Sequence, residues 1–323
     1  MGITGIGVHV PDRVFTNHDL AQFVDTSDEW IVERTGIRER RFAREDEALT
    51  DIAFPAAQRA LAQAGADPAS IDLIVVATVT PDMMFPTTSA LLADSLGMPD
   101  AAAYDLLAGC TGFMYALAQA YAMVASGLAS RALVVGGDVL SKILDWTDRS
   151  TLVLFGDGAG AVVVEHVDGT GGFLGFELGA DGGGGENLWL PGSGSRHFDD
   201  ADRLVKMNGR EVFKFATRVL VSSAEKVLDE CGCTVADVDV YVPHQANRRI
   251  IDHAARKLGI PEEKVVVNVD RYGNTSSGSI PLALADAVAD GRLREGELVL
   301  MTGMGAGLTW GSALMEWTNG RAA

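Results

Sequence analysis

The chain has 323 residues, of which 47% are hydrophobic and 22% charged, a composition typical of a globular protein with a large core. Its formal charge of −18 disfavours nucleic acid as a general partner, because phosphates would be repelled. No run of about 18 apolar residues could span a membrane, and the first residues lack the pattern of a secretory signal, so we expect no membrane segment.

Helix-like and strand-like segments alternate along the chain. Apolar runs without polar alternation are typical of buried strands, and periodic runs that end at a glycine are typical of helices. The helix-like segments are 49–65 and 111–127, and the strand-like segments are 71–79, 131–139 and 150–167. The glycine-rich stretch 169–195 is expected to be irregular. This alternation predicts an α/β protein with mainly parallel sheets covered by helices.

The second half of the sequence repeats the first. Residues around Gly65 match those around Gly232, 167 residues further on, and DSLGMP matches RKLGIP. VASGLASRALVV then matches VADGRLREGELVLM, and GDGAGAVVVE matches GMGAGLTWGSALMEW. The smaller offset of the last pair indicates an insertion in the first half, of about the length of residues 142–155. We therefore predict a duplicated α/β unit with two domains, residues 1–170 and 171–323.

Cys110 and Asn274 occupy equivalent places in the repeat, 164 residues apart, each at the start of a predicted helix. Equivalent positions of a pseudo-twofold fold can face one another, so we expect both residues in one cavity. A thiol at a helix N-terminus meets unpaired N–H groups that favour the thiolate. His244 follows a predicted strand, at the edge where α/β sheets place ligands. Taken singly, each also fits a structural role, as a buried thiol, a helix cap or a core histidine.

Cys, His and Asn without a metal motif suit thioester chemistry. Cys110 can accept an acyl group, while His244 and Asn274 can donate N–H bonds to a developing enolate oxygen. That pairing suits decarboxylation of a malonyl thioester, whose carbanion then attacks the acyl-cysteine. The glycine-rich turn 303–307 can supply a backbone N–H for the second oxyanion. This chemistry needs no metal, flavin or nicotinamide cofactor.

The remaining cysteines, Cys231 and Cys233, form a C-x-C pair on a predicted turn. They lack the second pair that a zinc site requires, so we interpret them as structural. An odd number of cysteines argues against a disulfide framework and for a reducing, cytoplasmic setting.

Through these residues the chain resembles the thiolase superfamily, and most closely the β-ketoacyl-acyl-carrier-protein synthase III family, which initiates type II fatty-acid synthesis. The motifs that carry the resemblance are TSDEWIVERTGIRER, FGDGAG, NGREVFKFA, VPHQANRRII, DRYGNTS and LTWGSAL. Elongating synthases of the superfamily use Cys-His-His and thiolases add a second Cys, so His244 and Asn274 match the initiating class. The resemblance implies α-β-α-β-α layers with mixed sheets, and a homodimer.

The resemblance also implies roles for individual residues. Cys110 would be acylated by an acyl-CoA, and His244 and Asn274 would promote decarboxylation of malonyl-acyl-carrier protein. The implied oxyanion hole is formed by Cys110, Ala306 and Gly307. The implied CoA contacts are Thr26, Trp30, Arg34, Arg149 and Asn247, with Trp30 and Arg149 clamping the adenine. The implied carrier-protein contacts are Lys214, Gln245, Ala246, Asn247, Arg248, Arg249, Arg256 and Lys257, a basic region that suits an acidic carrier.

The implied primer pocket involves Phe85 and Met304. Phe85 matches the family residue that reaches across the dimer to limit primer length, which would indicate a short primer such as acetyl-CoA. From the sequence alone, Phe85 fits a plain core aromatic equally well. Met304 stands where the family commonly has Phe, and its flexible side chain can adapt to different acyl chains. Thr111 and Ala306 also depart from the family pattern, and Ala306 leaves open which amide completes the oxyanion hole.

Other functions are compatible with parts of this pattern. An acyltransferase of secondary metabolism on the same fold would move the acyl group to an alcohol or amine, but such relatives often alter the His/Asn pair. A cysteine hydrolase would need neither a CoA clamp nor a basic docking face. A catalytically silent subunit would not need to retain Cys110, His244 and Asn274 together.

Overall fold

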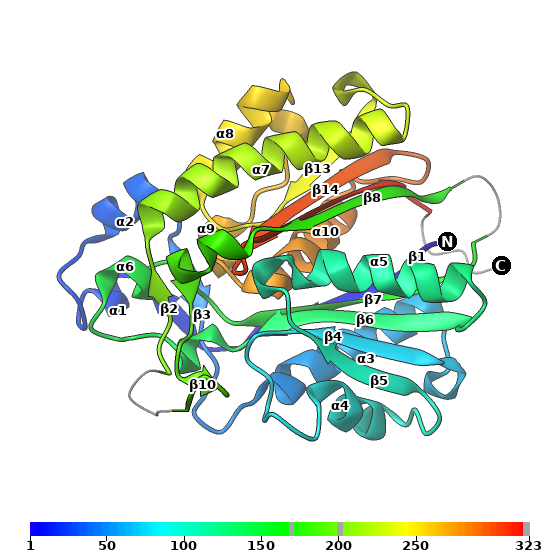
Figure 1. Ribbon diagram of the computed structural model, residues 1–323, viewed down its shortest axis with the longest axis horizontal. Coiled ribbons are helices and arrows are strands. Elements are labelled where there is room, and N and C mark those ends of the chain that lie inside the picture. The colour runs from blue at the N-terminus through cyan, green and yellow to red at the C-terminus, as the bar shows by residue number, and fades with distance from the viewer. Residues whose placement is uncertain (168–170, 199–202, 319–323) are drawn as a thin grey trace.

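The computed structural model describes residues 1–167, 171–198 and 203–318. Two large mixed sheets alternate with layers of helices in the order α-β-α-β-α (Figure 1). The first sheet has the strand order β1-β7-β6-β4-β5, and the second has the order β13-β14-β15-β8. Their strands are β1 (Gly2–His9), β4 (Leu73–Ala77), β5 (Ala102–Leu106), β6 (Arg131–Asp138), β7 (Gly158–Glu165), β8 (Gly172–Ala180), β13 (Val240–Pro243), β14 (Leu298–Gly305) and β15 (Thr309–Glu316).

The strand orders confirm the duplication. Strands β4, β6, β7 and β1 of the first sheet correspond to β13, β14, β15 and β8 of the second, and β5 has no counterpart among the described strands. Among these corresponding strands, each half has one parallel pair followed by two antiparallel pairs, and β5 adds a second parallel pair to the first sheet. The prediction of mainly parallel sheets was therefore wrong, and the mixed sheets implied by the resemblance are confirmed. The tight connection 306–308 between β14 and β15 explains one reversal, because only antiparallel strands can be joined by so short a turn.

Helices fill three layers. Helices α5 and α10 lie between the two sheets. Their sequences are apolar nearly all round, as is typical of helices that are buried on all sides. Helices α3 and α4 cover the outer face of the first sheet, and α7 and α8 cover the outer face of the second (Figure 1). These helices are α3 (Leu49–Ala64), α4 (Thr88–Leu96), α5 (Gly112–Ala125), α7 (Gly209–Glu230), α8 (Arg248–Leu258) and α10 (Ser279–Ala289).

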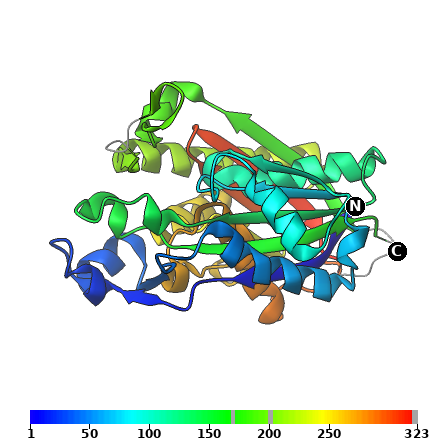
Figure 2. The same ribbon diagram turned by 90° about the horizontal axis from the view of Figure 1, so that it is seen from below.

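Short elements gather at one end of the sheets, opposite the N-terminus of the chain (Figure 1 and Figure 2). They include β2 (Val14–Thr16), α1 (Asn17–Leu20), α2 (Asp28–Thr35), β3 (Glu39–Arg41), α6 (Arg149–Leu152), α9 (Val269–Tyr272), β9 (Leu188–Trp189) and β12 (Lys206–Met207). Buried Arg40 ties this end together, because its guanidinium donates to Asn17 Oδ1 at 2.8 Å and to the Val153 carbonyl at 2.9 Å. Burial lowers the pKa of Arg40 to about 10.

The remaining elements are brief turns and bridges. The 3₁₀ turns are η1 (Pro68–Ser70), η2 (Gly109–Thr111), η3 (Leu140–Lys142), η4 (Gly182–Asn187), η6 (Val235–Asp237), η7 (Glu262–Lys264) and η8 (Ser276–Gly278), and the small strands are β10 (Ser193–Gly194) and β11 (His197–Phe198). Within the described ranges, no helix is both long and apolar enough to cross a membrane.

Two segments differ from the sequence prediction. Residues 150–157 do not extend the strand, because Asp148 caps α6 by accepting a bond from Ser150 N at 2.8 Å. The glycine-rich stretch contains β8, paired with β15, where glycine leaves room for neighbouring side chains: a Cβ at Gly179 would collide with the Trp310 ring. The predicted domain boundary at residue 170 falls in 168–170, outside the described residues. The insertion predicted in the first half lies in the connection 139–157 between β6 and β7. The equivalent connection in the second half, between β14 and β15, consists only of 306–308.

Candidate active site

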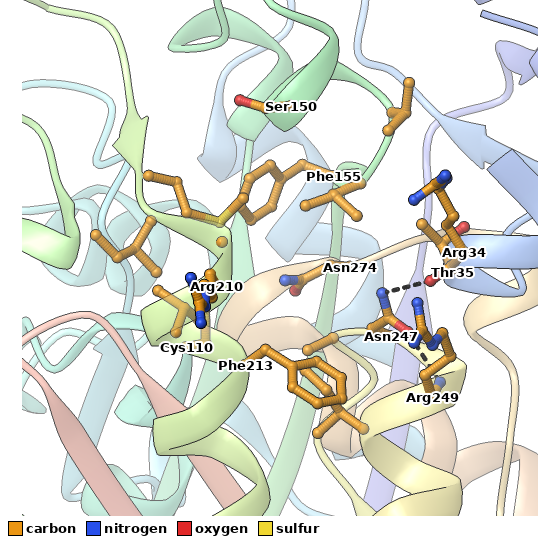
Figure 3. A pocket seen from close by; sticks show the side chains of 18 of the residues that line it. Arg34, Thr35, Cys110, Ser150, Phe155, Arg210, Phe213, Asn247, Arg249 and Asn274 are labelled. Atoms are coloured by element: carbon orange, nitrogen blue, oxygen red, sulfur yellow. Dashed lines mark hydrogen bonds between the residues drawn. The ribbon is translucent and has the colours of Figure 1, made fainter. Parts of the chain in front are cut away.

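A cavity of about 710 Å³ opens where β13 and β14 end, and residues from both halves line it. Cys110 comes from the first half, whereas His244, Asn274 and Met304 come from the second. Cys110 and Asn274 both point toward the open space seen in Figure 3. The three predicted catalytic residues, widely separated in the sequence, therefore share one cavity.

Glycines allow the Cys110 turn to touch the end of β14. Cys110 lies in η2, directly before α5, and Gly109 has a φ of 56°. A Cβ at Gly109 would lie 2.6 Å from the Ala306 carbonyl, and a Cβ at Gly305 would lie 2.5 Å from Cys110 N. The two backbones therefore meet without side chains between them, which brings the amides of Cys110 and Ala306 close together.

Thr111 takes part in the same junction. Its hydroxyl lies 3.1 Å from that of Thr309, which is also 3.0 Å from both the Ala108 and Ala306 carbonyls. The threonine that departs from the family pattern thus braces the nucleophile turn against the turn after β14.

Burial favours the protonated form of the Cys110 thiol. Burial raises the pKa of the thiol to about 12. The helix N-terminus was expected to favour the thiolate, but loss of water around the sulfur outweighs that effect.

His244 is held as a neutral imidazole. Its Nδ1 lies 2.5 Å from the Ser279 hydroxyl, and its buried Nε2 has no partner among the described residues. Burial lowers the pKa of His244 to about 3, so the ring stays uncharged at neutral pH.

Asn274 is fixed by its own backbone and its amide oxygen. Its Oδ1 accepts a bond from Ser276 N at 2.8 Å, which leaves Nδ2 as the free donor of the side chain. The Asn274 N–H donates to the Leu154 carbonyl, and the Asn274 carbonyl accepts from Gly156 N, each at 2.9 Å. The side chain is thus preorganised to offer an N–H into the cavity that it lines.

Cys110 also borders a second, smaller cavity of about 270 Å³. Ser276, Ala306 and Gly307 lie beside Cys110 at its wall. The rest of the wall is mainly apolar and consists of Val79, Leu107, Leu140, Ile143, Phe155, Leu188, Trp189, Leu190 and Val205. The nucleophile therefore lies at the junction of a large cavity and a small apolar one.

The predicted primer-pocket residues lie elsewhere. Met304 lines the larger cavity, beside His244. Phe85 is 83% exposed and lines neither cavity, so it can limit a primer only by entering a second subunit, as the resemblance implies. The smaller cavity was missed from the sequence because its wall comes from several distant segments of ordinary apolar residues.

Three predicted CoA contacts form a stacked group. The guanidiniums of Arg34 and Arg149 lie 4.7 and 4.6 Å from the centre of the Trp30 ring. Asn247 caps α8 and donates to the Arg34 carbonyl at 3.1 Å, which joins α8 to α2 (Figure 3). Thr26 does not line the larger cavity, although its buried hydroxyl has no partner within the described part of the chain.

The structure corrects part of the predicted carrier-protein contact. Gln245 is fully buried, and its Nε2 donates to the carbonyls of Pro243 at 2.7 Å and Val266 at 3.1 Å. Ala246 is also buried, at the wall of the larger cavity. The Gln245 side chain therefore cannot meet a docked protein, whereas Ala246 can meet only a group that enters the larger cavity.

The cationic side chains of this region differ in the ion pairs that they form. Arg248 is held by Asp252 at 2.6 Å and by Glu262 at 2.7 Å. Lys214 pairs with Glu211 at 2.7 Å on the exposed face of α7. The docking surface, as we use the term, consists of Lys214, Arg249, Arg256 and Lys257, all exposed or at the mouth of the cavity.

A duplicated α-β-α-β-α fold with Cys, His and Asn gathered between its halves defines a thiolase-like condensing enzyme. In the described ranges, no cluster of three or more His, Cys, Asp or Glu residues is placed to hold a metal ion. Residues 104–182 match the family model described as 3-oxoacyl-acyl-carrier-protein (ACP) synthase III, and residues 228–317 match its C-terminal model. The chain belongs to the β-ketoacyl-acyl-carrier-protein synthase III family.

Individual relatives match this chain over nearly its whole length. Proteins named beta-ketoacyl-acyl-carrier-protein synthase III from Desulfitobacterium hafniense and Symbiobacterium thermophilum are 51% and 53% identical, with 98% of each chain covered. The crystal structure of the corresponding synthase from Thermus thermophilus has a TM-score of 0.94 and 52% identity, and the match covers 99% of this chain and 100% of that one.

Proposed function

We propose that the chain joins an acyl-CoA primer to malonyl-acyl-carrier protein, giving 3-ketoacyl-acyl-carrier protein, CO2 and CoA, and so initiates fatty-acid synthesis. The placement of Cys110 between the two cavities carries this proposal. The small apolar cavity suits a short acyl chain, such as acetyl, while the larger cavity admits the thioester arm that delivers it.

In the first step Cys110 is the nucleophile. Its sulfur attacks the thioester carbonyl carbon, the new carbon–sulfur bond replaces the bond to CoA, and the thiol proton leaves with the CoA thiol. Backbone N–H groups of Cys110 and of Ala306 or Gly307 support the developing oxyanion, since these residues border the smaller cavity together.

In the second step His244 and Asn274 are the enolate-stabilising pair. The malonyl thioester loses CO2, and the electrons of the broken carbon–carbon bond move into its thioester carbonyl. His244 Nε2 and Asn274 Nδ2 donate to that oxygen, provided Ser279 donates to His244 Nδ1 and so places the ring proton on Nε2. The enolate carbon then attacks the acyl group and releases the Cys110 thiolate.

The CoA adenine is proposed to stack on Trp30. In the absence of CoA the Arg149 guanidinium already occupies one face of that ring, so the base displaces it or stacks above it. Arg34, Asn247 and Thr26 complete the predicted contact, with Asn247 acting mainly by holding α2 beside α8.

A homodimer in the cytoplasm is part of the proposal. Met83, Met84, Phe85 and Leu107 are exposed apolar side chains near the smaller cavity, and a second copy of the chain would cover them. The cysteines are unpaired, which suits a reducing compartment. We also propose that the halves divide near residue 170, because β7 belongs to the first sheet and β8 to the second.

The docking surface gives a first prediction. Charge reversal by Arg256→Glu with Lys257→Glu should raise the KM for malonyl-acyl-carrier protein about tenfold, because an acidic carrier would meet negative charge. Acylation by acyl-CoA should be spared, since neither residue lines the larger cavity. Steady-state and single-turnover assays measure the two steps separately.

The matched control reverses Arg292 and Arg294, which changes the net charge equally at the far end of β14 from Cys110. It should leave both steps unchanged. An equal loss of both steps in the Arg256/Lys257 variant would contradict docking at this surface. The effect should also weaken as salt rises.

The function itself is tested with purified protein, malonyl-acyl-carrier protein and acyl-CoAs from acetyl to octanoyl, straight and branched. Mass spectrometry should detect an acyl group on Cys110 and a 3-ketoacyl-carrier product, with preference for short primers. An acylated Cys110 that yields no ketoacyl product with any primer would point instead to acyl transfer onto another acceptor.

A further inference from the structure

Ser276 has a strained backbone beside the nucleophile. In the described part of the chain it is the one residue other than glycine with a positive φ, at 52°. Side chains disfavour this region, so a serine persists there only when the surrounding fold imposes the conformation. Such outliers gather at functional sites, which makes the environment of its side chain informative.

The fold holds this turn from both sides. Ser277 Oγ lies 2.9 Å from Asp138 Oδ2 and 2.8 Å from the Ala77 carbonyl, both in the first half. The Ser276 N–H donates to Asn274 Oδ1 at 2.8 Å. The conformation of Ser276 is therefore fixed by the same contacts that orient Asn274.

The Ser276 hydroxyl lacks a partner among the residues that the structure describes. The residue is 1% exposed, and its buried Oγ makes no well-directed hydrogen bond with the described residues. A buried hydroxyl without a partner is costly unless a partner appears during function. Ser276 and Cys110 line the smaller cavity together, and η8 packs against η2.

The thiol responds to this hydroxyl. Burial raises the pKa of Cys110, and the nearby Ser276 side chain is the largest influence that opposes this rise. A neutral thiol is a weak acceptor, whereas a thiolate accepts a charge-assisted bond from a hydroxyl. The unpaired hydroxyl thus has a partner once the sulfur loses its proton.

We propose that Ser276 is a further catalytic residue, whose hydroxyl donates to the Cys110 thiolate and supports it until the sulfur attacks the acyl thioester. The proposal rests on Cys110 as the proposed nucleophile. No bond to Ser276 forms or breaks: its proton stays on oxygen, and the hydrogen bond is lost as the sulfur becomes acylated. The strained φ belongs to a residue that lines the smaller cavity together with Cys110, where its hydroxyl can meet the sulfur.

The test compares Ser276→Ala with Ser276→Gly. The first removes the hydroxyl and keeps the strain, and the second removes both. Alkylation of Cys110 by iodoacetamide, followed by mass spectrometry across pH, should be roughly 10- to 100-fold slower at neutral pH in both variants, with the profile shifted to higher pH. Acylation by acetyl-CoA should fall in parallel, while decarboxylation of malonyl-acyl-carrier protein should change less.

Ser223→Ala is the matched control, because Ser223 is a buried serine whose hydroxyl pairs with Ser312 at 2.7 Å, away from both cavities. It should leave the alkylation profile unchanged, and thermal melting checks that every variant folds. A wild-type alkylation profile in Ser276→Ala would overturn the proposal. Full reactivity of Cys110 in Ser276→Gly would also overturn it, because only the backbone conformation of residue 276, and not its hydroxyl, would then matter. Alkylation of Cys110 by iodoacetamide needs no acyl substrate. A failure of this proposal can therefore be distinguished from a failure of the proposed condensation.

Discussion

Cys110→Ala is expected to abolish formation of 3-ketoacyl-acyl-carrier protein while leaving decarboxylation of malonyl-acyl-carrier protein intact. Without the sulfur no acyl-enzyme forms, so condensation should fall by at least about 10⁴-fold. In the proposed mechanism decarboxylation depends on His244 and Asn274, which have their own fixing contacts to Ser279 and Ser276. The released enolate should take a proton from water and give acetyl-acyl-carrier protein.

Mass spectrometry of both carrier products and release of labelled CO2 measure this separation. Cys110→Ser serves as the size-matched control, because a hydroxyl is far less readily ionised than a thiol and should also fail to condense. If Cys110→Ala lost decarboxylation as completely as condensation, the division of labour between the sulfur and the donor pair would be wrong.

His244→Ala should produce the opposite separation. Acyl transfer from acetyl-CoA to Cys110 should persist, because the oxyanion of that step lies on the side of Ala306 and Gly307. Decarboxylation should fall by roughly 10²- to 10³-fold, the usual cost of removing one oxyanion donor. The intact-protein mass would show the trapped acyl-enzyme, and CO2 release would show the defect.

Asn274→Asp is a nearly isosteric variant that tests the other donor of the pair, since it replaces the Nδ2 donor by an oxygen that repels the enolate.

The pH dependence of decarboxylation tests the protonation state of His244. The pKa of His244 lies at about 3, below the ordinary value of 6.5, so the ring stays neutral as pH falls through 6.5 and the decarboxylation rate should show no acidic limb there. An acid limb near pH 6.5 that disappears in His244→Ala would contradict a neutral imidazole donor.

The repeat allowed the central pair of the site to be predicted from the sequence. An offset of 164 residues placed Cys110 and Asn274 at equivalent helix starts, and the structure places them before α5 and α10, packed between the two sheets. Periodicity also identified α3, in spite of Pro55 inside it. These features depend on local spacing, which the chain displays directly.

Features that depend on packing could not be read in the same way. Gln245 lies in a polar-looking motif beside exposed arginines, yet its amide satisfies buried carbonyls. The glycines of β8 suggested an irregular segment, but they accommodate the Trp310 ring and the Cys231 sulfur across the sheet. The helix N-terminus suggested a thiolate at Cys110, whereas the depth of burial decides its protonation. Each error concerns burial against other parts of the fold, which the local sequence pattern does not display.

The position of Cys110 between a large and a small cavity imposes an order on the reaction. Once the acyl group moves into the small cavity, the space that held the CoA arm is the space that the malonyl arm must occupy. The first product therefore has to depart before the second substrate arrives, and free CoA competes with the carrier arm for one volume. With the proposed placement of the two thioester arms, we expect a ping-pong sequence in which free CoA competes with malonyl-acyl-carrier protein and slows chain initiation.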